Sequence, residues 1–112
     1  MIEALWSVEF KSNMQSLGSG VVVIETGRVL GGDAGFLYVG NVKVVNEIVH
    51  VNIKVTRYST VLGLPSIFGN WNEFHIEATG PLNSTNILFQ GHVVENPELK
   101  ITVQATRRAE LP

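Results

Sequence analysis

The sequence predicts an all-β fold, a single up-and-down antiparallel β-barrel of about eight strands that spans residues 1–112 as one domain. Three observations lead to this prediction. Apolar and polar residues alternate with period two along most of the chain, turn-forming residues separate the alternating runs, and no segment shows the 3.6-residue periodicity of an amphipathic helix. Short sequential strands of this kind are typical of a meander.

The first half of the chain predicts four strands. Residues 4–12 alternate strictly, with Trp6, Val8 and Phe10 on one face, as expected for a strand with one buried and one solvated side. The next three strands are delimited by Thr26-Gly27 and by Gly31-Gly32-Asp33, which are residue types that favour tight turns. These boundaries place the three strands at residues 18–25, 28–31 and 36–45.

The second half predicts four more strands by the same two signals. Apolar residues alternate with polar ones over residues 48–57, 72–80 and 99–108, and residues 86–94 form the remaining strand. The turn signals between these strands are Asn46-Glu47, Gly80-Pro81 and Asn96-Pro97.

Eight short strands with one apolar face can bury that face by closing on themselves, which also removes exposed sheet edges. The interior of an eight-stranded barrel is filled by side chains or holds one small ligand. The aromatic residues expected to fill it or line it are Trp6, Phe10, Tyr38, Tyr58, Phe74 and Phe89.

One long connection, residues 59–71, is far more apolar than a solvated loop of its length. It can fold across one mouth of the barrel and seal the core, form a lid over a small apolar ligand, or bury itself against a second subunit. Its candidate contact residues are Leu62, Leu64, Ile67, Phe68 and Trp71.

Composition and charge limit the location and the classes of binding partner that we expect. The chain has no cysteine, which agrees with a reducing compartment, and no signal peptide is visible, so a cytoplasmic location is expected. Only eight Lys and Arg residues and a net charge of −2 argue against direct binding to nucleic acid. The uncharged stretches are too short and too polar for a membrane span.

No catalytic or metal site is apparent. His50, His75 and His92 could meet as a zinc site, but His50 and His75 fall at polar, outward positions and have no His two residues away. Glu73 and Glu77 lie about 13 Å apart at strand rise, too far for paired acid and base work. We therefore expect no enzyme activity and no cofactor.

Asp33 lies in the glycine-rich segment Gly31–Gly35. No helix follows that could supply amide groups to a phosphate, so a turn in which Asp33 caps its own backbone is the better interpretation.

Several segments, in this order along nearly the whole chain, carry a family resemblance: Ile2–Phe10, Gly18–Val23, Gly27–Asp33, Tyr38–Gly40, Val55–Tyr58, Pro65–Gly69 and Asn72–Phe74. Together they resemble the bacterial GrlR-like family, named for a negative regulator of type III secretion. The most specific part of this resemblance is Gly31-Gly32-Asp33 followed by Tyr38-Val39-Gly40. The resemblance implies a lipocalin-like (calycin) barrel that tends to form a homodimer and, in the named branch, represses by binding a transcriptional activator.

That branch carries an acidic run in a hairpin loop associated with activator contact. The matching place here has Val45, Asn46 and Glu47, with a single acid, so a contact through this hairpin would rely on shape and apolar area. The leading hypothesis is a non-enzymatic regulatory or adaptor protein that acts through protein contacts. The alternative is a carrier or sensor of a small apolar ligand held in the barrel. The volume left inside the barrel distinguishes them, because a cavity of roughly 300 Å³ or more favours the carrier.

Overall fold

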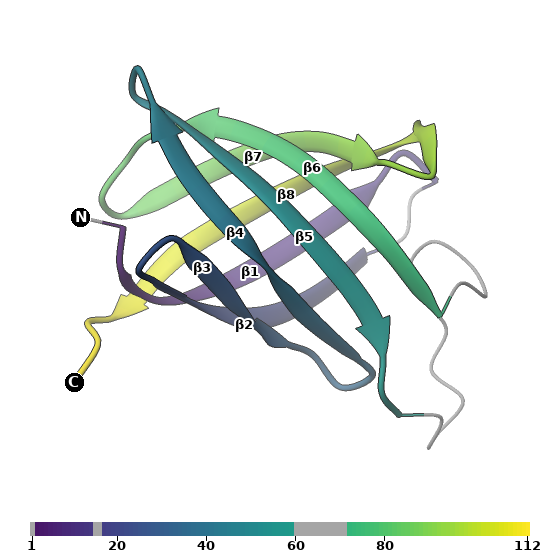
Figure 1. The fold of residues 1–112 in the computed structure, drawn as a ribbon, viewed down its shortest axis with the longest axis horizontal. Helices are drawn as coiled ribbons and strands as arrows, with labels where there is room; N and C mark the ends of the chain where they lie inside the picture. The colour runs from purple at the N-terminus through teal and green to yellow at the C-terminus, as the bar shows by residue number, and fades with distance from the viewer. Residues whose placement is uncertain (1, 15–16, 60–71) are drawn as a thin grey trace.

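The alternating segments form strands that wrap into a closed barrel. The computed structural model describes residues 2–14, 17–59 and 72–112. Its strands are β1 (Ala4–Ser12), β2 (Leu17–Glu25), β3 (Arg28–Gly32), β4 (Phe36–Val45), β5 (Ile48–Arg57), β6 (Glu73–Pro81), β7 (Asn86–Val93) and β8 (Asn96–Ala109). Each strand pairs antiparallel with the next, and β8 pairs with β1 (Figure 1). The predicted eight-stranded up-and-down barrel is confirmed.

Two hairpins turn through residues with positive φ, as their sequences predict. Thr26 and Gly27 have φ of 51° and 74°, and Asn46 and Glu47 have φ of 51° and 66°. Two consecutive left-handed residues are the pattern of a type I′ turn, whose twist matches that of the flanking strands.

The predicted turn at Asn96-Pro97 is wrong, because β8 already begins at Asn96, which pairs with Val93. The turn is formed by Val94 and Glu95, two residues earlier in the sequence. It is held there by β6: the Val94 amide donates to the His75 carbonyl oxygen at 2.8 Å, and the His75 amide donates to the Glu95 carboxylate at 2.8 Å. Proline at the second residue of a strand is tolerated, because strand ends leave backbone groups unpaired.

Closure brings neighbouring strands very close at inward-facing glycines. A Cβ at Gly40 would lie 1.9 Å from the Asn52 carbonyl oxygen, and one at Gly91 would lie 2.0 Å from that of Glu77. No residue with a side chain fits at either position without moving the backbone. These glycines let the wall bend sharply, as closing a small barrel requires.

The two ends of the barrel differ. The packed end, on the left in Figure 1, carries both termini and the β2–β3, β4–β5 and β6–β7 turns. Its centre is Trp6, which is 0% exposed and whose indole N–H donates to the Ile2 carbonyl oxygen at 2.8 Å. We call the opposite end, which carries the β1–β2, β3–β4, β5–β6 and β7–β8 connections, the open end; the name refers only to the described residues, and 15–16 and 60–71 lie outside them.

No helix in the described part of the chain is long and apolar enough to cross a membrane.

Candidate functional site: an apolar cavity with one carboxylate

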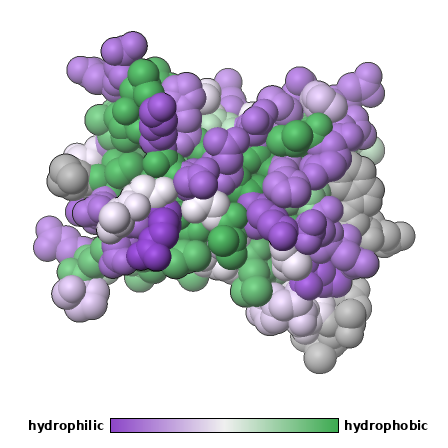
Figure 2. Space-filling model, viewed as in Figure 1, coloured by the Kyte–Doolittle hydropathy of each residue, from purple (hydrophilic) through white to green (hydrophobic). Residues whose placement is uncertain are grey.

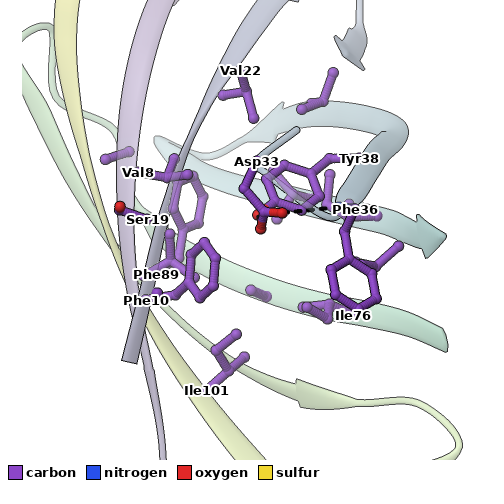
Figure 3. Close-up of a pocket in the computed structure, with 18 of the residues that line it drawn as sticks. Val8, Phe10, Ser19, Val22, Asp33, Phe36, Tyr38, Ile76, Phe89 and Ile101 are labelled. Atoms are coloured by element: carbon purple, nitrogen blue, oxygen red, sulfur yellow. Dashed lines mark hydrogen bonds between the residues drawn. The ribbon is translucent and has the colours of Figure 1, made fainter. Parts of the chain in front are cut away.

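A cavity of about 290 Å³ occupies the barrel interior, and its lining extends from Ile24 and Val29, beside the β2–β3 turn, to Leu17 and Asp33 at the open end. All eight strands contribute side chains to its wall, part of which Figure 3 shows. Trp6 is also among the residues that line it. The inward positions midway along several strands hold small residues, including Gly40, Ala78, Gly91 and Ala105. Because these side chains are short, the larger ones around them leave the middle of the barrel unfilled.

The cavity has the dimensions of a small-molecule site. At roughly 30 Å³ per water-sized group, it accommodates about ten non-hydrogen atoms. Its volume is close to the lower limit of typical ligand pockets, about 300 Å³. Its walls are almost entirely aliphatic and aromatic, which is the composition that favours apolar ligands.

Five of the six aromatic residues expected in the interior line the cavity, namely Trp6, Phe10, Tyr38, Phe74 and Phe89. The expectation for Tyr58 is wrong. Tyr58 follows the last residue of β5, is 55% exposed, and donates its hydroxyl to the Asp33 carbonyl oxygen at 2.9 Å. Its amide also donates to the Gly35 carbonyl oxygen at 3.0 Å. Tyr58 therefore fastens the β3–β4 loop from outside the barrel.

Aromatic pairs shape the open end. The Phe10 and Tyr38 rings meet edge to face, with centroids 6.1 Å apart, and the Phe36 and Phe74 rings are tilted at a centroid distance of 6.4 Å. The Arg57 guanidinium lies over the Phe36 ring, 4.7 Å from its centroid. These contacts fix ring orientations at the mouth of the cavity.

Asp33 is the single residue with a formal charge among those that line the cavity within the described ranges. As predicted, its carboxylate caps its own turn: Oδ1 accepts hydrogen bonds from the Gly35 and Phe36 amides, both at 2.9 Å. The other oxygen, Oδ2, accepts the hydroxyl of Tyr38. The sequence predicted only that Asp33 caps its own turn. In the structure the same turn also places the negative charge of Asp33 beside the apolar cavity.

The Tyr38 hydroxyl is held in its neutral form. Burial of the ring raises the pKa of Tyr38, and its hydrogen bond to Asp33 and the charge of that carboxylate raise it further. Tyr38 is only 7% exposed, so water does not replace these interactions. The hydroxyl therefore remains a donor to Asp33 over the whole neutral and mildly alkaline range.

Sequence reasoning missed the aliphatic part of the wall. Five aliphatic residues that line the cavity fall at inward positions of their strands, namely Val51, Ile53, Ile76, Ile101 and Val103. The alternation alone could have identified them as interior residues. It could not have shown that they face an unfilled space.

The candidate contact loop of Leu62, Leu64, Ile67, Phe68 and Trp71 lies outside the described residues. The candidate partner hairpin is described: Val45 is 40% exposed, and Asn46 and Glu47 form the turn. Two neighbours, Val44 and Ile48, are also exposed. Figure 2 shows apolar surface along this hairpin, at the upper left of the view, below a polar tip.

A second apolar surface covers the outside of β2, β3 and β4. Strand register places Leu30 between Val23 and Val39, and Gly32 between Val21 and Leu37. Val21 and Val39 are 51% and 50% exposed. We call Val21, Val23, Leu30, Leu37 and Val39 the outer patch.

The three histidines lie apart on the outer surface. His75 Nδ1 lies 2.5 Å from Glu95 Oε2, His92 Nε2 lies 3.3 Å from Glu77 Oε1, and His50 is exposed. Among residues 2–14, 17–59 and 72–112, no group of three or more His, Asp and Glu side chains could hold a metal ion.

No family model and no curated protein matches the chain. A solved structure described as a redesigned beta barrel is similar, with a TM-score of 0.51 and 14% sequence identity over 96% of this chain and 91% of the other. At this identity the likeness concerns the fold alone, a β-barrel.

Proposed function

We propose that this protein is a non-enzymatic carrier or sensor that holds one small apolar molecule inside its barrel. The observation that carries the proposal is the cavity of about 290 Å³, walled by aliphatic and aromatic side chains. A barrel that served only as a scaffold would gain stability by filling this volume, because each unfilled part of a core forfeits packing energy. A retained cavity is therefore best explained by an occupant.

The buried polar side-chain groups already have hydrogen-bond partners within the described part of the protein. No buried side-chain nitrogen or oxygen among the described residues lacks a hydrogen-bond partner. The Trp6 indole N–H and the Tyr38 hydroxyl both have acceptors. An apolar ligand could therefore enter without leaving a protein polar group unsatisfied.

The experiment is a calorimetric titration with nonan-1-ol, a molecule of about ten non-hydrogen atoms that matches the cavity volume. The test variant is Ile53→Trp, which places a large ring inside the cavity. The control is Asn52→Trp, which places the same ring on the outer face of the same strand. We expect binding to wild type and to Asn52→Trp, and its loss in Ile53→Trp. Equal binding to all three proteins would contradict the proposal.

Native mass spectrometry of protein purified gently from its own host complements this titration. It reports retained small molecules, subunit number and co-purifying protein in one measurement. A stoichiometric small-molecule adduct would support the carrier.

A second candidate function is a regulatory or adaptor protein that acts through protein contacts, as the resemblance to GrlR-like regulators implies. The outer patch favours it, because a contiguous exposed apolar surface usually marks an interaction site. Its occupant would be a second copy of the chain or a transcriptional activator.

The test of this second function is the oligomeric state by light scattering at micromolar concentration. The variant Leu30→Lys charges the centre of the outer patch, and Asn52→Lys, outside the patch, is its control. We expect Leu30→Lys alone to shift a dimer to a monomer. A wild-type protein that is strictly monomeric and captures no activator would contradict the contact function.

A further inference from the structure

We propose that the cavity selects small hydrophobic amines, whose protonated amino group binds the Asp33 carboxylate while the hydrocarbon part fills the barrel. This inference rests on the proposed function and specifies the chemical class of its ligand. It follows from the charge of the cavity, from the unused acceptor capacity of Asp33, and from the rigidity of the loop that carries it.

The charge of the cavity favours a cation. Asp33 is the single formally charged residue that lines it within the described ranges, and the surrounding wall is apolar. Asp33 is half-buried, so its carboxylate loses part of its hydration, which a bound cation compensates. In the view of Figure 3, Asp33 lies between Phe10 and Phe89 on one side and Ile76 on the other.

Hydrogen-bond counting leaves room for one more donor. A carboxylate offers about four acceptor positions. Oδ1 accepts the Gly35 and Phe36 amides, and Oδ2 accepts the Tyr38 hydroxyl. One position on Oδ2 is therefore left for a single N–H donor, which an amine supplies together with its charge.

The neighbouring polar groups do not cancel this preference. Tyr38 stays neutral because burial raises its pKa, so it does not add a second negative charge. Arg57 lies over the Phe36 ring, donates from Nε to Asn72 Oδ1 at 3.2 Å, and is not among the residues that line the cavity. An anionic ligand such as a fatty acid would meet the like charge of Asp33.

The loop is fixed before a ligand binds. Beyond the two amide bonds to Oδ1, the Asp33 amide donates to the Phe36 carbonyl oxygen at 3.0 Å, and Tyr58 fastens the loop from outside. The carboxylate therefore needs little ordering on binding, and such preorganisation increases affinity.

The experiment compares three probes of similar length by calorimetry at neutral pH: nonylamine, nonan-1-ol and nonanoate. The variant is Asp33→Asn, whose amide oxygen can still accept the Gly35 and Phe36 amides and so preserves the turn. Glu9→Gln, which removes one exposed charge from the outer face of β1, is the matched control. Circular dichroism establishes that each variant is folded.

We expect wild type and Glu9→Gln to bind nonylamine about ten- to hundredfold more tightly than nonan-1-ol, and nonanoate most weakly. In Asp33→Asn the preference for the amine should disappear while nonan-1-ol binds as before. Tightest binding of nonanoate, equal affinities, or an amine preference that survives Asp33→Asn would overturn the inference and leave the carrier function standing. If wild type binds none of the three probes, the carrier function itself fails and the inference falls with it.

Discussion

The two ends of the barrel use the same strands for different purposes. At the packed end, Trp6 and Val49 are each 0% exposed, and Val49 is not among the residues that line the cavity. Further along β5 toward the open end, Val51 and Ile53 continue the inward face of Val49, yet they line the cavity. The difference teaches that one strand pattern can build both a stabilising core and a binding site, depending on the sizes of the side chains that meet across the barrel.

The largest expected effect tests the packed end by truncation. Trp6→Ala removes a fully buried indole and its hydrogen bond to Ile2, and should lower the free energy of unfolding by about 3–5 kcal/mol. Phe10→Ala, at the partly exposed open end, should lower it by less. Urea denaturation followed by circular dichroism measures both. An equal loss of unfolding free energy in the two variants would contradict the difference in packing between the two ends.

The next test enlarges two residues of β5. Val49→Phe adds volume at a fully buried position of the packed end and should destabilise the protein by about 1–3 kcal/mol through overpacking. Val51→Phe makes the same change two residues along the same face, where the cavity can receive the ring. We expect no loss of stability there, and weaker binding of nonan-1-ol. A comparable loss at Val51 would show that the open end is already filled.

Alkaline pH probes the polar group of the open end. The folded pKa of Tyr38 is raised above its unfolded value, near 10, so the native state retains a proton that the unfolded state loses. The stabilisation is fully present below pH 10 and decreases above it, by at most about 1.4 kcal/mol per pH unit. Unfolding midpoints between pH 9 and 11 should therefore fall more steeply in wild type than in Tyr38→Phe. Parallel profiles would contradict this assignment.

The smallest effect concerns the rim of the open end. Burial raises the pKa of Glu95, but the hydrogen bonds from the His75 side chain and backbone outweigh it and hold the pKa below its usual range. The contribution of Glu95 is thus present above its unfolded pKa and is lost as pH falls through the folded one. Because the pair is exposed, Glu95→Gln should lower stability at pH 7 by less than about 1 kcal/mol, as thermal unfolding can measure. A larger loss would mean that the β7–β8 turn depends on this pair.

Much of the fold was predictable because its signals are local. Alternation and turn residues placed β4 and β5 at their observed bounds, 36–45 and 48–57. The turn before β8 was displaced because Val94 and Glu95 are bound by His75, a residue twenty positions away in sequence. A local pattern cannot register such a contact.

The candidate site was predictable in part. The alternation of inward and outward side chains along each strand identified the interior aromatic residues Phe10, Tyr38, Phe74 and Phe89. Tyr58 lies beyond the end of β5, where this alternation no longer applies. The local turn of Asp33 was also foreseen. Its position beside the cavity and its hydrogen bond to Tyr38 were not, because they depend on how β4 folds back against β3.

By itself, the sequence determined the strands, their hairpin order, the inward and outward faces and the absence of cysteine chemistry. These properties follow from the period of two and from turn residues, which act over a few neighbours. Only the tertiary structure decided that the described residues enclose a cavity and that the Asp33 carboxylate lines it. A cavity is the volume left when side chains from eight strands meet, so it depends on all their sizes and on the register that closes the barrel.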